Sequence, residues 1–159
     1  MRRGSTRGRC IVAALLTALV GTTAAHADEH RARRVPPPPE YTQECGACHL
    51  AYPAWLLPAT SWQRVMDSLA RHYGTDASLD AAQAQRLSAW LQANAATGKR
   101  AVPPPEDRIT RAAWFQREHD EVPAATWALP AVKSRAQCAA CHTQAEQGDF
   151  SERHIRLPR

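Results

Sequence analysis

Apolar residues recur at helical spacing in two stretches near the middle of the chain. The first stretch, Thr60 to Tyr73, has apolar side chains three or four positions apart: Trp62, Val65, Met66 and Leu69. The second stretch runs from about Ala81 to Ala96 and repeats the pattern with Leu87, Trp90 and Leu91. Side chains at this spacing share one face of a helix. The pattern therefore predicts two amphipathic helices, which end at Gly74 and Gly98.

Capping residues predict where several helices begin. Three pairs have the spacing of a capping box: Thr60 with Gln63, Asp80 with Gln83, and Ser134 with Gln137. We expect a short helix over Tyr41 to His49, a third helix that starts after Thr110, and a last helix from about 138 to 148. No stretch alternates convincingly between apolar and polar residues as a strand would. The sequence predicts an all-α fold with few or no strands.

Two proline-rich segments divide the chain. Pro36 to Pro39 follows a charged stretch, and we interpret residues 28–40 as a disordered tail. Pro103 to Pro105 lies in a second such segment, which we interpret as a linker. The domain is then expected to span residues 41–159, with a first half at 41–98 and a second half at 107–159.

The first 27 residues have the pattern of a signal peptide. Four arginines precede an apolar segment, Ile11 to Val20, which is too short to span a bilayer. Ala25 to Ala27 matches a cleavage site, so we expect cleavage after Ala27 and export to the periplasm. Cleavage would remove four of the 20 Lys and Arg residues and none of the 15 Asp and Glu residues. The formal charge then falls from +5 to +1, which gives no support to nucleic-acid binding.

Each half contains one C-x-x-C-H motif, the attachment signature of c-type haem. The two motifs are Cys45-Gly-Ala-Cys48-His49 and Cys138-Ala-Ala-Cys141-His142. Two cysteines three positions apart can bond to the two vinyl groups of one porphyrin, and the following histidine can ligate the iron. Structural zinc or redox disulfides are the alternatives. Zinc explains the four cysteines but not the histidine after each pair, so we expect two covalent haems.

The second axial ligand of each iron decides the chemistry of the haem. Met66 lies within an apolar stripe and is expected to be an ordinary core residue. Besides the two motif histidines and one histidine in the signal peptide, the chain has four candidates: His30, His72, His119 and His154. His30 lies in the charged tail, where we expect it to be solvated.

His72 and His119 lie on predicted helices beside apolar residues. A histidine so placed is often only structural, but two irons that need a sixth ligand favour ligation. We expect His49 and His72 on the first iron and His142 and His119 on the second. Crossed pairing, or His154 in place of His119, remains open.

The chain resembles the small periplasmic dihaem cytochromes c often called DHC, over about Glu44 to Pro158. The stretches that carry the resemblance are Glu44 to Pro53, Leu56 to Pro58, Ser61-Trp62, His72 to Gly74, Arg108 to Thr110, Trp114-Phe115, Arg117 to His119 and Cys138 to Asp149. The resemblance implies a small helical dihaem fold and two low-spin, bis-histidine haems at low potential. It also implies distal histidines in motifs like those around His72 and His119.

The same resemblance implies electron transfer as the function. The implied partners are a membrane b-type cytochrome as donor and an oxygen-binding monohaem c-type cytochrome. Two closed irons leave no place for a substrate, so we expect an electron carrier with no catalytic residues. We also expect a monomer that is at most peripheral to a membrane. The alternatives are a haem enzyme or gas sensor with one open iron, and a zinc-stapled interaction module.

Overall fold

The computed structural model describes residues 35–158. These residues form helices and 3-10 turns, with three isolated β-bridges and no strand among them. The predicted all-α fold is therefore confirmed. The expected signal peptide, most of the expected tail and His30 lie outside the described residues. Within residues 35–158, every helix is too short or too polar to cross a bilayer.

Helix α1 (Pro39–Gly46) carries the start of the first motif. Proline at the first helical position favours helix initiation, because its φ is preset and its missing N–H would be unpaired there anyway. Tyr41 is buried, and its hydroxyl donates to the carbonyl of Tyr52 at 2.5 Å. The helix ends three residues before the predicted end at His49. Cys45 thus lies in its last turn, and Cys48 and His49 follow in a turn.

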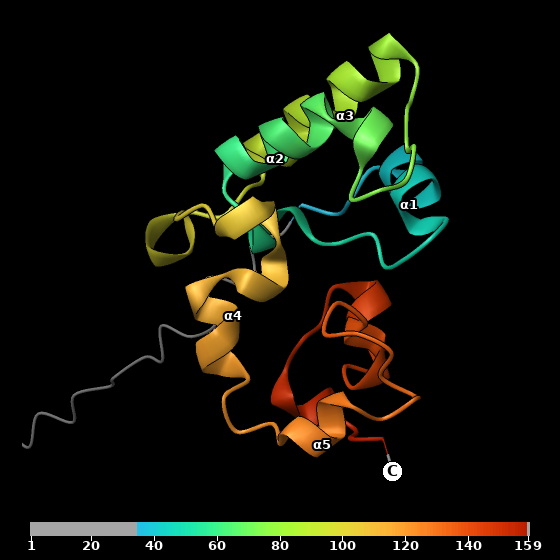
Figure 1. Ribbon diagram of the computed structural model, residues 1–159. Coiled ribbons are helices and arrows are strands. Elements are labelled where there is room, and N and C mark those ends of the chain that lie inside the picture. Colours follow the sequence, from blue (N-terminus) through green and yellow to red (C-terminus); the bar gives the residue numbers. More distant parts are fainter. Residues whose placement is uncertain (1–34, 159) are drawn as a thin grey trace, which may run out of the picture. The chain divides into compact units, whose positions relative to one another are not determined.

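Helices α2 (Ala59–Asp67) and α3 (Ala81–Ala93) lie side by side (Figure 1). Their buried side chains form one cluster with residues of α1 and of the following loop: Tyr41, Ala54, Leu57, Trp62, Leu87 and Leu91. The indole nitrogen of Trp62 donates to the carbonyl of Ala54 at 2.6 Å. The apolar positions that predicted these helices therefore form the core of the first half.

The ends of both helices differ from the prediction. Helix α2 ends at Asp67 rather than Tyr73. The Ser68 hydroxyl donates to the Arg64 carbonyl at 2.7 Å, and this is the carbonyl to which the backbone N–H of Ser68 would donate if the helix continued. The predicted cap by Thr60 is wrong, since the N-cap residue is Pro58, without a side-chain hydrogen bond. Helix α3 ends at Ala93 rather than Ala96.

The cap at the start of α3 is confirmed. The carboxylate of Asp80 accepts a hydrogen bond from the backbone N–H of Gln83 at 2.9 Å. This contact satisfies one of the N–H groups that the first turn of a helix leaves unpaired.

The proline-rich segment after α3 is attached to the first half. It contains the 3-10 turns η3 (Gly98–Arg100) and η4 (Pro105–Asp107), and Pro104 is buried. Both carboxylate oxygens of Asp107 accept hydrogen bonds from Arg64 of α2, at 2.8 and 2.6 Å. The C-terminal end of this segment, at Asp107, therefore contacts α2. The division of the domain into two halves stays a prediction.

The second half consists of short elements. Turn η5 (Ile109–Arg111) leads into α4 (Ala113–Glu118), which is followed by α5 (Ala124–Trp127). The predicted last helix is wrong, because the chain forms the separate 3-10 turns η6 (Cys138–Ala140), η7 (Ala145–Gln147) and η8 (Glu152–His154). The Ser134 hydroxyl accepts from the Ala136 N–H at 3.2 Å and so closes a turn rather than capping a helix.

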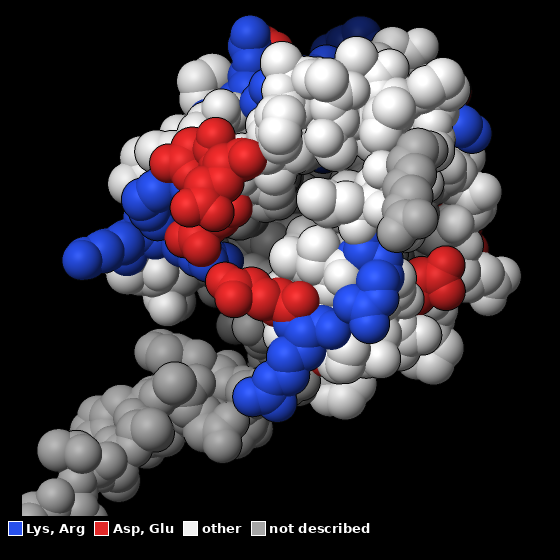
Figure 2. Space-filling view, turned by 90° about the horizontal axis from the view of Figure 1, so that it is seen from below, with Lys and Arg blue, Asp and Glu red and all other residues white. Residues whose placement is uncertain are grey.

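Charged side chains of both signs lie beside one another on the face shown in Figure 2. Arg86 pairs with Glu40 at 3.1 Å, and Arg117 pairs with Glu118 at 3.2 Å. This mixing agrees with the small formal charge expected for residues 28–159.

Candidate functional site

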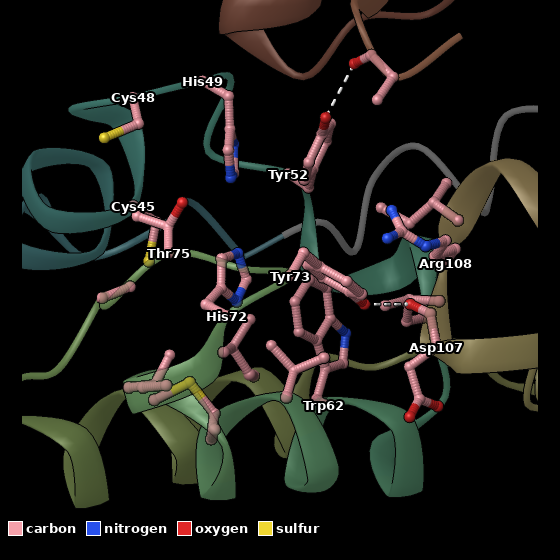
Figure 3. Close-up of a pocket in the computed structure, with 18 of the residues that line it drawn as sticks. Cys45, Cys48, His49, Tyr52, Trp62, His72, Tyr73, Thr75, Asp107 and Arg108 are labelled. Atoms are coloured by element: carbon pink, nitrogen blue, oxygen red, sulfur yellow. Dashed lines mark hydrogen bonds between the residues drawn. The ribbon is translucent and has the colours of Figure 1, made fainter. Parts of the chain in front are cut away.

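The first motif lines one end of a cavity of about 490 Å³ (Figure 3). Cys45, Cys48 and His49 reach the cavity from α1 and the turn behind it. Apolar side chains of the core form much of the remaining wall: Leu57, Trp62, Val65, Met66, Leu69 and Leu91. Binding cavities for cofactors typically have about 300–1,000 Å³ and mostly apolar walls. The first motif thus opens into a cofactor-sized, largely apolar space.

His72 faces His49 across this cavity. The centres of the two imidazole rings are 6.1 Å apart, and the ring planes differ by 26°. Two imidazoles that each bind one metal ion through a nitrogen at about 2 Å have ring centres about 6 Å apart, because the ring radius adds to each bond. The observed separation of His49 and His72 therefore leaves room for one metal ion between them.

The early end of α2 is what places His72. The chain leaves η2 (Leu69–Arg71) at His72 and turns back through Tyr73 and Gly74, which have φ of 49° and 102°. The N–H of Thr75 donates to the His72 carbonyl at 3.0 Å and closes this turn. A straight helix to Tyr73, as predicted, would have lacked this turn. Glycine suits the second position because L-residues with a side chain rarely adopt such a φ.

Hydrogen bonds set the tautomer of His49. Its Nδ1 lies 2.7 Å from the carbonyl oxygen of Leu50, which can only accept, so Nδ1 carries the proton. The lone pair of His49 is then on Nε2, the state suited to metal ligation. Burial, and after it the neighbouring His49, lowers the pKa of His72. At neutral pH His72 is consequently a neutral imidazole, which can also act as a ligand.

The second motif brings His142 to His119. Their ring centres are also 6.1 Å apart, with ring planes that differ by 72°. His119 is the C-cap residue that follows α4, and its ring stacks on that of Phe115 with centres 4.1 Å apart. Its Nδ1 donates to the Phe115 carbonyl at 2.9 Å. Trp127 and Phe150 border the pair at 5.9 Å from His119 and 5.3 Å from His142. The ring centres of the second histidine pair are thus as far apart as those of the first, and aromatic side chains surround the second pair.

One ring nitrogen of His142 lacks a partner within residues 35–158. Its Nδ1 is buried and makes no hydrogen bond there. A buried polar atom without a partner destabilises a fold by about 1–3 kcal/mol. A buried imidazole nitrogen without a hydrogen-bond partner is available to a metal ion.

The backbone at His154 adjoins the second motif, because the next residue, Ile155, forms an isolated β-bridge with His142, but the His154 side chain makes other contacts. Its Nδ1 is 3.0 Å from the carboxylate of Asp149 and 3.3 Å from the Ser151 hydroxyl. Its carbonyl accepts from the backbone N–H and the hydroxyl of Thr143. The structure therefore brings His142 to His119 rather than to His154, and it does not cross the pairs.

The four described cysteines form no disulfide with one another. Burial is the largest cause that raises the pKa of Cys45 and of Cys138 to about 11. Within residues 35–158, no three His, Cys, Asp or Glu side chains form a cluster suited to a metal ion. The arrangement gives no support to the zinc and disulfide alternatives.

Tyr52 links the two motifs, and sequence reasoning missed this role. Its ring stacks on His49 at 4.9 Å, and its hydroxyl donates to the carbonyl of Ala136 at 2.8 Å. Cys138 lines the same cavity as Cys45 and Cys48. Tyr52 and Ala136 are 84 positions apart, so no local sequence pattern predicts their contact.

Known proteins similar to this chain are described as dihaem cytochromes c. Residues 41–150 match the family model described as dihaem cytochrome c. The diheme cytochrome type c of Shewanella baltica OS155 is 42% identical, with a TM-score of 0.68, and the match covers 78% of this chain and 95% of that chain. For DHC from Rhodobacter sphaeroides the identity is 45%, the TM-score 0.63, and the coverage 73% and 99%. A search of curated proteins found no match.

The residues present fit two haems. Each motif supplies two thiols and a histidine, a second histidine faces each motif histidine at a metal-compatible spacing, and the first pair lies in an apolar cavity. Together with the match over residues 41–150, this shows that the chain belongs to the dihaem cytochrome c family and carries two covalently attached haems c.

Proposed function

We propose that this protein is a periplasmic electron carrier with two bis-histidine haems. In this proposal His49 and His72 ligate the first iron, and His142 and His119 ligate the second. The observation that carries the proposal is the equal 6.1 Å separation of the ring centres in both histidine pairs. When bound, each haem supplies a one-electron iron(III)/iron(II) couple.

The surroundings of the ligands support a carrier rather than an enzyme. With an imidazole on both sides, neither iron has an open position for a substrate or a gas. The hydrogen bonds from His49 to Leu50 and from His119 to Phe115 fix both ring orientations and raise the basicity of the ligands. More basic ligands stabilise iron(III), which agrees with haems of low potential.

The partners belong to the same proposal. We infer a membrane b-type cytochrome as the donor and a soluble, oxygen-binding monohaem c-type cytochrome as the acceptor, as the family resemblance implies. Electrons would then pass one at a time through this protein. Stopped-flow mixing of the reduced protein with such an acceptor would test this part, and a lack of electron exchange would contradict it.

Single histidine substitutions test the ligand assignment. His72→Ala should make the first haem high-spin, and His119→Ala should do the same for the second, each with new carbon monoxide binding in the reduced protein. His154→Ala is the matched control and should leave both haems low-spin. High-spin haem in the unaltered protein, or in His154→Ala alone, would contradict the assignment. Carbon monoxide binding by the unaltered protein would instead favour a sensor or enzyme with an open iron.

A further inference from the structure

Arg108 stands at the end of the first cavity that is opposite the cysteines. Figure 3 shows Cys45 and Cys48 on one side of the histidine pair and Arg108 on the other. Among the described residues that line this cavity, Arg108 is the only lysine or arginine. Three carboxylates also line it, those of Glu44, Asp76 and Asp107, and the remaining wall is mainly apolar, so this guanidinium is the one lysine or arginine side chain there that can pair with an anion.

An unusual backbone holds Arg108 in this place. The two residues before it, Glu106 and Asp107, have φ of 56° and 54°, a region that residues with side chains rarely adopt. The Tyr73 hydroxyl donates to both of their carbonyls, at 3.2 and 3.0 Å, and the Arg108 guanidinium lies 4.3 Å above the Tyr73 ring centre. Strained backbone persists where the surroundings enforce it, often at ligand sites.

The guanidinium has capacity for a further partner. Its Nε donates to Glu106 at 3.3 Å, whereas its two Nη nitrogens make no hydrogen bond within residues 35–158. The nearby carboxylate of Asp107 is already engaged by Arg64. The Nη nitrogens therefore remain for an acceptor inside the cavity.

The covalent attachment of haem c indicates which group would accept hydrogen bonds from the Nη nitrogens of Arg108. The two vinyl groups that bond to the cysteines lie on one edge of the porphyrin, and its two propionate carboxylates lie on the opposite edge. Cys45 and Cys48 fix the vinyl edge at one end of the cavity, so the carboxylates must point toward the other end. A planar guanidinium binds carboxylates in a bidentate manner.

We propose that Arg108 binds a propionate of the first haem and raises the reduction potential of that haem. Reduction adds one negative charge to the haem, and a nearby cation stabilises the reduced state. This proposal rests on the first haem lying between His49 and His72. We expect the loss of the cation to shift the ratio of reduced to oxidised haem by up to about tenfold, or about 59 mV for one electron.

The test is a spectroelectrochemical titration of the purified holoprotein in which low-temperature EPR follows each haem. Arg108→Gln should lower the midpoint potential of one haem and leave the other unchanged. Arg108→Lys keeps the charge and should recover most of the potential. Arg111→Gln is the matched control, because Arg111 also pairs with Glu106 but does not line the cavity.

The outcomes separate this proposal from the ligand assignment. Unchanged potentials in Arg108→Gln, with both haems low-spin, would overturn the role of Arg108 and leave the ligands intact. An equal shift in Arg111→Gln would also overturn it, since it would show a general surface-charge effect. If Arg108→Gln fails to retain haem, the Arg108→Lys variant serves as the test. Because lysine keeps the positive charge, a fall of about 59 mV in the midpoint potential of Arg108→Lys would contradict the proposal.

Discussion

Replacing Tyr41 by phenylalanine removes one hydroxyl from the core of the first half. Tyr41 is 2% exposed, and its hydroxyl donates to the carbonyl of Tyr52 at 2.5 Å. Without this donor a part-buried carbonyl loses its partner, at a cost of about 1–3 kcal/mol. For a chain of this size 1 kcal/mol corresponds to about 4 °C in the unfolding midpoint. We therefore expect the midpoint of Tyr41→Phe to fall by about 4 to 12 °C.

The same substitution at Tyr52 is the matched control. The Tyr52 hydroxyl donates to the Ala136 carbonyl at an exposed position, where water can replace it. Tyr52→Phe should therefore cost less than about 1 kcal/mol. Thermal unfolding followed by far-UV circular dichroism, on samples with equal haem content, compares the two variants. A loss in Tyr52→Phe as large as that in Tyr41→Phe would refute the reasoning from burial.

Two further predictions concern a helix cap and an ion pair. Asp80→Ala should destabilise the protein by about 1 kcal/mol through loss of the α3 cap. Thr60→Ala is the control and should leave the free energy of unfolding, measured in urea, almost unchanged. Equal losses of stability in the two variants would contradict the cap assignment. Hydrogen bonds from Arg64 lower the pKa of Asp107, so the pair stabilises the fold above the ordinary pKa of the carboxyl and this contribution is lost as the pH falls through the lowered value. Asp107→Asn should make stability depend less on pH in the acid range, and an unchanged acid profile in urea titrations would contradict this.

Local chemistry explains which features the sequence could predict. The C-x-x-C-H motifs and the Asp80 cap depend on residues within a few positions of one another, so their patterns are visible in the chain. The helical spacing around Trp62 and Leu87 likewise reports the core directly. These signals were sufficient for the all-α fold and for the two covalent haems, whereas the pairing of the histidines on the irons stays a prediction.

Features that depend on competing or distant contacts were not predictable. The end of α2 is decided by a hydroxyl of Ser68 that competes for a backbone carbonyl, and apolar spacing does not register such competition. The turns around the second motif replace a predicted helix. The contact from Tyr52 to Ala136 and the position of Arg108 over Tyr73 arise from tertiary packing alone.

Low-temperature EPR of the oxidised holoprotein tests the bis-histidine assignment most directly. Two low-spin ferric signals of bis-histidine type, one for each haem, are expected from the pairs His49/His72 and His142/His119. The different angles between the ring planes, 26° and 72°, should give the two haems distinct signals. A high-spin ferric signal of one haem, or an optical band of methionine ligation, would contradict the assignment.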